Sequence, residues 1–340
     1  MKFAVKAWSS GKARAGVLQL GSCPGPIETP SLLLSTRKGL PHFIPPDLLY
    51  SLPSPDSHLF HVSSLHFLEG LSPQTISKIG GLHQMLGLPE HGFVCIPRDS
   101  IQCLPECNSS NKFGASFETP CGRRLIKPVE YVELISSLRP NIWTTLADEV
   151  PTWVSEKRNK TSVDRTIRWL DECIALNPDI LQEEKPRLIT GLGLPEEILQ
   201  GVAAGIDVFD STYLCHLTLG GFALTFPLDG VEMNTSDNIG SDQTKINLRA
   251  TVYRKDISPI VENCNCYTCK NHTKAYINHL LNVHEMLAQT LLEIHNTHHY
   301  IGFFCSVREA IKSGNFEQFR QKFVEGRCYH VAAEAAAACM

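Results

Sequence analysis

Three cysteines close together in the sequence are the residues best suited to specific chemistry. They form a Cys-x-Cys-x-x-Cys motif at Cys264, Cys266 and Cys269. Thiolate and imidazole groups are preferred ligands of zinc, and three sulfurs with one nitrogen complete its tetrahedral shell. No position then remains for a catalytic water, so the motif predicts a structural zinc site. The alternative is a chance cluster in a chain that contains 13 cysteines.

The fourth ligand is less well defined by the sequence. The histidines that could supply it are His272, His279, His284, His295, His298 and His299. Residues 272–295 have a helical composition, and one unbroken helix of that length would separate its ends by about 35 Å. His295 therefore reaches the thiols only if the chain turns back, which we expect near residues 282–284. Spacing alone does not exclude His272 or His279, which are closer in sequence.

Acidic residues at the ends of predicted strands form a second group with chemical potential. Three strand-like segments end at or just before an aspartate: residues 93–97 before Asp99, 141–146 before Asp148, and 205–210 at Asp210. These segments alternate with helical patterns, which predicts an α/β fold with its chemistry at the carboxyl ends of parallel strands. One aspartate could act there as a nucleophile and another as a proton shuttle. Aspartate is also a common turn and capping residue, which is the alternative.

The elements that would position these residues are also predicted by local patterns. Segments 16–20 and 31–35, bounded by glycine and proline, predict β-hairpins near the start of the chain. Ser162 has the spacing of an N-cap for an amphipathic helix over residues 163–174. The Gly-Leu-Gly sequence at 191–193 predicts a tight turn before a helix, or alternatively a phosphate cradle.

Composition limits the possible classes of protein. The 340 residues are 43% hydrophobic and 19% charged, which is enough for a substantial core. The formal charge of −4 argues against nucleic-acid binding by a basic field over the whole surface, so any RNA contact must be local. An odd number of cysteines, no apolar signal core after Met1 and no membrane-spanning apolar run predict a reducing, cytoplasmic compartment.

Several stretches together carry a family resemblance. They are Gly80-Gly81-Leu82-His83 and residues 162–169 (SVDRTIRW), 185–189 (KPRLI), 205–210 (GIDVFD), 245–249 (KINLR) and 263–270 (NCNCYTCK). In combination they resemble the tRNA-guanine transglycosylases, and within that family the accessory subunits of the eukaryotic queuine enzymes. The resemblance extends from about Gly16 to Phe323. It implies a TIM barrel with a zinc-bearing insertion, whose ligands fall on Cys264, Cys266, Cys269 and His295.

The resemblance is weaker at the residues that it identifies as catalytic. Asp210 lies at the position of the family nucleophile, but residues 211–216 (STYLCH) replace the Cys-Val-x-Pro-Thr-Arg that should follow. Asp99 resembles the start of the Asp-Ser-Gly-Gly-Phe-Gln motif, although Ile-Gln at 101–102 replaces its glycine pair. Asp148 corresponds to the family's Phe-Asp-Glu-Cys position, where we expect at most a substrate-binding role. A nucleophile without its positioning residues loses most of its advantage, so these carboxylates are interpreted as vestigial.

The chain also resembles a shortened family member. Between Cys173 and Lys185 the family carries two βα units, yet only residues 174–184 remain here, and one unit needs roughly thirty residues. We therefore expect a barrel that lacks about two βα units and is open between strands near Leu146 and Ile189. The predicted organisation is a single barrel domain over 1–326, including a zinc-binding subdomain at 255–304, followed by a non-family tail at 327–340.

The resemblance further implies a function and partners. We expect a non-catalytic subunit with one structural Zn²⁺ that pairs with a catalytic queuine tRNA-ribosyltransferase subunit as a heterodimer. The pair would contact tRNA and exchange guanine for queuine at the wobble position of tRNAs with GUN anticodons, in the cytoplasm or in peripheral association with an organelle membrane. Two alternatives are a stand-alone transglycosylase, with Asp210 as nucleophile and Asp99 as proton shuttle, and a zinc-dependent RNA-binding module. The lost motif residues argue against the first alternative and the acidic balance against the second.

Overall fold

The computed structural model describes most of the chain. It covers residues 1–9, 11–68, 71–99, 101, 110–119, 122–176, 185–228 and 244–325. The predicted tail at 327–340 and most of the shortened segment at 174–184 lie outside the described residues. Among the helices of the described part, none is both long and apolar enough to cross a membrane.

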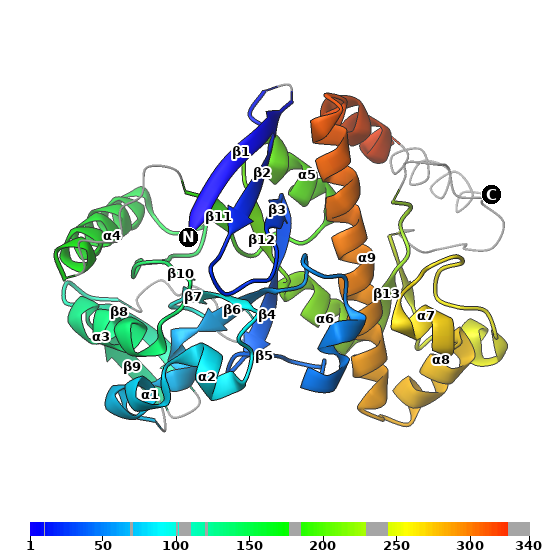
Figure 1. The fold of residues 1–340 in the computed structure, drawn as a ribbon, viewed down its shortest axis with the longest axis horizontal. Helices are drawn as coiled ribbons and strands as arrows, with labels where there is room; N and C mark the ends of the chain where they lie inside the picture. Colours follow the sequence, from blue (N-terminus) through cyan, green and yellow to red (C-terminus); the bar gives the residue numbers. More distant parts are fainter. Residues whose placement is uncertain are drawn as a thin grey trace.

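Six parallel strands form the central sheet of the described residues (Figure 1). In spatial order they are β10 (Ile142–Trp143), β7 (Gly92–Ile96), β6 (Leu59–Ser63), β4 (Ser31–Arg37), β12 (Val208–Asp210) and β11 (Leu188–Ile189). The short β5 (Leu40–Pro41) pairs antiparallel with β4. The first four barrel strands in the chain are thus β4, β6, β7 and β10, and β11 and β12 return to the other side of β4.

The outer strands of this sheet, β10 and β11, border the predicted opening. A TIM barrel closes with eight strands, and within the described residues neither β10 nor β11 has a partner on its other side. A cavity of about 280 Å³ lies between them and is lined mainly by apolar residues, including Val94, Ile142 and Leu188. The prediction of an incomplete α/β barrel is confirmed.

The strand predicted over residues 141–146 is shorter than expected. Only Ile142 and Trp143 pair with β7, although the backbone amides of Asn141 and Thr144 also donate to carbonyls of that strand. Within the described residues β10 pairs with β7 alone. Its ladder of backbone hydrogen bonds ends where the chain diverges from β7 toward Asp148. The prediction was therefore right in position and wrong in length.

A small antiparallel sheet packs against the amino-terminal end of the barrel. It contains β1 (Lys2–Trp8), β2 (Arg14–Gln19) and β3 (Ile27–Thr29), so the hairpin predicted around residues 16–20 is confirmed. The other segment predicted as hairpin, residues 31–35, lies instead in the parallel barrel strand β4. Its apolar residues share one core with the inward side chains of the barrel strands. The fully or nearly buried members of this core are Phe3, Leu18, Leu20, Ile27, Leu33, Leu59, Val94, Ile96 and Val208.

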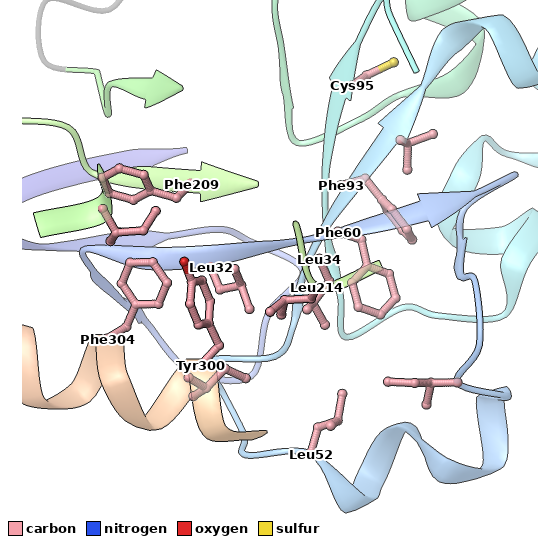
Figure 2. Close-up of a cluster of buried hydrophobic side chains, with 14 of the residues drawn as sticks. Leu32, Leu34, Leu52, Phe60, Phe93, Cys95, Phe209, Leu214, Tyr300 and Phe304 are labelled. Atoms are coloured by element: carbon pink, nitrogen blue, oxygen red, sulfur yellow. The ribbon is translucent and has the colours of Figure 1, made fainter. Parts of the chain in front are cut away.

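Helices cover the outside of the sheet, and the longest is α9 (Leu287–Lys312), which runs along its whole height (Figure 1). The others are α1 (Pro73–Ile79), α2 (Leu82–Leu86), α3 (Pro128–Leu138), α4 (Glu156–Leu176), α5 (Pro195–Ala203), α6 (Thr212–Gly220), α7 (Tyr267–Asn271) and α8 (Lys274–Asn282), with short helices at Pro46–Ser51, Ser64–Phe67 and Thr251–Lys255. Figure 2 shows the outward side chains Leu32 and Phe209 against Tyr300 and Phe304 of α9. The Phe209 and Phe304 rings are 5.7 Å apart, so α9 is fixed to the strands by aromatic packing.

The start of α4 differs from the prediction. The helix begins at Glu156, and Ser162 lies inside it rather than at its N-cap. Ser155 takes the capping role, because its Oγ accepts from the Arg158 amide at 3.3 Å and its carbonyl accepts from Asn159 at 2.9 Å. Ser162 instead donates its hydroxyl proton to the carbonyl oxygen of Asp148. Ser155 and Ser162 are the same residue type, so local sequence does not show which of them caps the helix and which donates to Asp148.

A second, smaller core lies beside the barrel. It is built from the hairpin of β13 (Phe222–Leu224) and β14 (Lys245–Asn247) together with α7, α8 and the first turns of α9. The chain turns between Asn282 and Leu287, with His284 at a φ of 61°, so the predicted reversal is confirmed. The remaining pair, β8 (Ala115–Thr119) and β9 (Gly122–Ile126), forms a hairpin before α3.

Candidate metal centre and barrel mouth

Four side chains of the smaller core converge on one point. The ligand atoms of Cys264, Cys266, Cys269 and His295 all lie within 4.8 Å of one another and could hold a metal ion. His295 Nδ1 is 4.0, 3.5 and 3.3 Å from the sulfurs of Cys264, Cys266 and Cys269, respectively. Sulfur and nitrogen ligands on one tetrahedral zinc ion lie about 3.5 Å apart, given bonds of about 2.3 and 2.0 Å. The residues therefore fit the size of such an ion.

Local structure places the three cysteines around this point. Cys266 is the N-cap of α7, and its sulfur accepts a hydrogen bond of 3.2 Å from the amide of Cys269. Asn263 has a φ of 61°, a left-handed conformation that asparagine tolerates, directly before Cys264. Thr268 Oγ1 donates to the carbonyl oxygen of Leu291 at 2.7 Å and so ties α7 to α9.

The imidazole of His295 is oriented from its other side. Its Nε2 is 2.8 Å from the carbonyl oxygen of Leu224, which can only accept, so Nε2 carries the proton and Nδ1 is free to bind a metal. Asn296 accepts from the Leu224 amide at 2.9 Å and holds the same strand in place. In metal-binding histidines, a hydrogen bond from the ring nitrogen that does not bind the metal usually fixes the tautomer.

The competing histidines have other surroundings. His299 donates through Nε2 to the carbonyl oxygen of Phe226 at 2.8 Å, and His272 stacks on Tyr276 with ring centres 5.2 Å apart. Among the described residues, the group that could hold a metal contains His295 and no other histidine. The ligand set implied by the family resemblance is thus the one that the fold brings together.

The thiols affect one another strongly when they are this close. Hydrogen bonds from Cys266 and Cys269 lower the pKa of Cys264, whereas the same kind of contact raises the pKa of Cys266. One thiolate is therefore stabilised at the expense of its neighbour, since the crowded sulfurs share the remaining protons. A bound cation would remove this conflict by stabilising every thiolate at once.

The three predicted aspartates all lie near the carboxyl ends of barrel strands, as expected. Asp210 is the last residue of β12, Asp99 follows β7 and Asp148 follows β10. All are buried, with exposed fractions of 1%, 7% and 2% in that order. Ser100 and Gln102, which belong to the segment that resembles the family's Asp-Ser-Gly-Gly-Phe-Gln motif, lie outside the described residues.

Both oxygens of the Asp210 carboxylate have partners within the chain. The amide of Gly191 donates to one oxygen at 2.9 Å, and the hydroxyl of Thr212 donates to the other. The amides of Gly193 and Leu194 are held by the side chain of Glu197, both at 3.1 Å. The amides of Gly191 and Gly193 therefore donate to carboxylates of this chain. The Gly-Leu-Gly sequence is a tight turn rather than a phosphate cradle.

Asp99 and Asp148 are likewise engaged. His66 lies 2.9 Å from Asp99. Asp148 accepts two hydrogen bonds of 2.8 Å from Arg158 and one of 3.0 Å from Arg165, both on α4. Burial acts to raise the pKa of Asp148, but the hydrogen bonds and charges of the two arginines outweigh it and leave the pKa lowered.

His61 lies near Asp99 and Asp210 and was not predicted from the sequence as a site residue. It is 2% exposed, on β6, and neither ring nitrogen has a hydrogen-bond partner in the described part of the chain. Burial lowers its pKa, although the charges of Asp210 and Asp99 act in the opposite direction. Strand alternation puts residues 59, 61 and 63 on one face, so the signal existed once that face was known to point inward.

The comparisons with known proteins agree with this architecture. The family model described as "Queuine tRNA-ribosyltransferase" matches residues 9–180 and 174–328. The two matched segments meet at residues 174–180, where the sequence predicts that two βα units are missing.

Similar proteins carry the name "Queuine tRNA-ribosyltransferase accessory subunit 2". That of Homo sapiens is 28% identical over 380 residues, covering 82% of this chain and 91% of the relative. That of Ixodes scapularis is 26% identical over 368 residues (86% and 91%), and that of Danio rerio 28% over 394 residues (88% and 93%). An alignment of 380 residues exceeds the 340 of this chain, so the human protein has residues that are missing here. From the family match over most of its length and the fold, the chain belongs to the queuine tRNA-ribosyltransferase family.

Proposed function

We propose that this chain is the non-catalytic subunit of a heterodimeric queuine tRNA-ribosyltransferase. In that role it supports exchange of guanine for queuine at the wobble position of tRNAs with GUN anticodons, and it contacts tRNA as part of the complex. The accessory-subunit names of its relatives support this assignment. So do the substitutions around Asp99 and Asp210 that separate the chain from the family's catalytic pattern.

The observation that carries the proposal is the state of Asp210. A nucleophilic carboxylate must present an oxygen to the sugar carbon that it attacks, at an angle that the surrounding residues fix. Here one oxygen accepts from Gly191 and the other from Thr212, while the imidazole of His61 is buried near the same carboxylate. These contacts favour a structural role for Asp210, namely to hold the turn after β11.

The metal of the smaller core is zinc, bound in a structural role. Three thiolates and one imidazole are a donor set that favours zinc over magnesium or calcium, and all four positions are supplied by the protein. When bound, such an ion contributes folding free energy and no reaction step. Cys264, Cys266, Cys269 and His295 would tie α7 to α9 through it. The zinc-binding subdomain at 255–304 then folds as part of one barrel domain over 1–326.

A stand-alone transglycosylase is the second candidate. The charges of Asp99 and Asp210 both act to raise the pKa of His61. The two carboxylates therefore lie at the same barrel mouth, as a nucleophile and its proton shuttle would. The reaction of such an enzyme would not require a partner protein. Both candidates act in the cytoplasm, where thiols remain reduced.

Measuring guanine exchange into tRNA under three conditions separates these functions. The chain alone, the catalytic subunit alone and an equimolar mixture are each given labelled guanine and unmodified tRNA. A non-catalytic subunit gives exchange only in the mixture, or a rate there well above that of the catalytic subunit alone. Exchange by the chain alone would instead support the stand-alone enzyme. If the chain gives no exchange alone and does not raise the rate in the mixture, both candidate functions are contradicted.

A further inference from the structure

An exposed row of apolar side chains, here called the α4 stripe, runs along one face of α4. Val163, Ile167 and Leu170 are 51%, 53% and 38% exposed. Residues spaced by four and three positions are neighbours on a helix surface, so the three side chains form a continuous row. Apolar side chains that are exposed together, rather than singly, mark surfaces that bind another molecule.

The α4 stripe is separate from the face by which α4 packs on the barrel. Trp169 and Cys173 are fully buried, and Trp169 belongs to the main core. Leu170 follows Trp169 directly, which places it about 100° further round a helix of 3.6 residues per turn. Among the helices, α3 packs against α4. The α4 stripe is therefore a second apolar face of a helix that already has its place in the core.

The α4 stripe lies at the open side of the barrel. The helix follows β10, and in the part of the chain that the structure describes β10 has a partner only in β7. The free edge of β10 also borders the cavity that separates it from β11. One βα unit therefore carries two surfaces that lack a cover within the described residues, a strand edge and an apolar helix face.

We propose that this βα unit binds a second copy of the chain, with the two α4 helices packed antiparallel about a two-fold axis. A closed barrel of eight strands has no free edge to offer, whereas a second copy has the same edge and the same stripe. A two-fold axis between two β10 edges, perpendicular to the sheet, makes both the strands and the helices antiparallel. One symmetry operation therefore brings edge to edge and stripe to stripe.

The charges beside the α4 stripe suit the antiparallel orientation. Lys160 lies one turn before Val163, Asp171 directly follows Leu170, and both charged residues are exposed. In an antiparallel pair centred on the stripe, Lys160 of each copy lies close to Asp171 of the other, so that opposite charges meet on both sides of the axis. In a parallel pair, Lys160 would face Lys160 and Asp171 would face Asp171.

The expected dimer is weak and closed. Three half-exposed side chains and one short strand edge from each copy bury less than the roughly 1,600 Å² of a standard interface. We therefore expect a dissociation constant in the micromolar range. A two-fold contact uses the same surface on both copies, so association stops at two.

Sedimentation velocity of the full chain, purified with its metal, from about 1 to 200 µM tests the proposal. We expect a monomer–dimer equilibrium in the parent chain. Val163→Glu and Ile167→Glu should each weaken it at least about tenfold, because they place a charge in the apolar contact. Ile257→Glu is the matched control, since Ile257 is an isoleucine outside α4 that is 83% exposed. Circular dichroism shows whether each variant is folded.

A charge exchange tests the orientation. Asp171→Lys should weaken the dimer severalfold, because it brings lysines of the two copies together. Adding Lys160→Asp should restore the parent affinity, since the double variant has the same opposite-charge contacts in reverse. Weakening in Asp171→Lys that the second change does not repair would contradict the antiparallel pair.

Three results would overturn the dimer. They are a parent chain that stays monomeric over the whole concentration range, one that grows beyond two copies, and equal dimerisation in the parent and both glutamate variants. If Ile167→Glu dimerises as the parent does but no longer raises guanine exchange in the mixture with the catalytic subunit, the stripe binds that subunit instead. Self-association requires neither tRNA nor another protein, so its outcome is independent of the proposed function.

Discussion

His295 donates a hydrogen bond of 2.8 Å from Nε2 to the carbonyl oxygen of Leu224. This contact joins the long α9 to β13 and turns the other ring nitrogen toward three sulfurs. The candidate metal centre therefore depends on a strand that contributes no ligand to it. The same relationship links this cluster to the barrel, because Leu224 and Phe209 belong to elements that both pack on α9.

Replacing Cys266 by Ser should release the metal and destabilise the smaller core. Serine can keep the N-cap of α7, since its hydroxyl can accept from the Cys269 amide as the sulfur does. Any loss of stability would therefore result from loss of the metal and not from loss of the helix cap. Elemental analysis should give about one zinc per parent chain and close to none in the variant, with a lower melting temperature.

The matched control for this variant is Cys23→Ser. Cys23 is also a free thiol, partly buried where Cys266 is fully buried, and it lies at the amino-terminal end of the barrel, away from the cluster. Its replacement should leave the zinc content unchanged. A parent chain that contains no zinc after purification without chelators would remove the assignment of the metal.

A charge on the open edge of the barrel should reduce self-association. Thr144 lies at the end of β10 and lines the cavity between β10 and β11, where an unpaired edge can recruit another chain. We expect Thr144→Lys to give less aggregate in sedimentation or light scattering than the parent chain. Asn159→Lys adds the same charge to the exposed surface of α4 and should have little effect.

The gap should also lower stability relative to full-length relatives. Several unpaired backbone groups at about 1 to 3 kcal/mol each approach the whole stability of a domain, about 5 to 15 kcal/mol. A melting temperature equal to that of a full-length relative would contradict this expectation. So would an experimental structure with eight paired strands in a closed ring.

Arg158→Ala should destabilise the fold by about 2 to 4 kcal/mol, because it leaves the buried Asp148 with one arginine in place of two. Arg168→Ala is the control on the same helix, since its pair with Glu172 is about half exposed and should contribute under about 1 kcal/mol. Urea unfolding of the three proteins measures both effects.

This difference should depend on pH in a defined direction. The arginines hold the pKa of Asp148 below its usual value of 3.8 despite burial. The stabilisation is therefore complete above about pH 4 and is lost as the pH falls through the lower pKa of the folded state. A destabilisation by Arg158→Ala that stays constant down to pH 2 would mean that the carboxylate is not the group concerned.

His61 should make the folded state less stable in acid. Burial lowers its pKa below 6.5, so below about pH 6.5 the unfolded chain gains a proton that the folded chain does not. Stability then decreases as the pH falls, and His61→Gln should make this decrease shallower below about pH 6.5. Unfolding in urea at several pH values gives the slope, and an unchanged slope in the variant would contradict the assignment.

Much of the fold could be predicted because its signals are local. The strands around Leu59, Phe93 and Val208 and the reversal near Asn282 follow from apolar patterns and turn residues. The incomplete barrel was predicted from the family resemblance, by comparing the length of residues 174–184 with that of the family. The three cysteines were also evident from spacing. The choice of His295 among several histidines required the family resemblance, because spacing did not decide it.

The features that could not be predicted depend on contacts between distant residues. Asp210 is held by Gly191, Asp148 by two arginines of the following helix, and Asp207 by Arg14, which is 193 residues away. The helix start was wrong because Ser155 and Ser162 are equally suitable caps in sequence, and only packing against Asp148 distinguishes them. The pairing of His58 with His91 requires two strand ends to meet, which no local pattern specifies.

The most direct test of the proposed function is the exchange rate of the complex that carries Asp210→Asn in this chain. Asparagine keeps an oxygen that can accept from Gly191, so the fold should persist, and circular dichroism checks this. We predict guanine exchange within about twofold of the parent complex, and no covalent link between this chain and tRNA. A loss of exchange of a hundredfold or more, together with a tRNA adduct on the parent chain that disappears in the variant, would show that Asp210 is a working nucleophile.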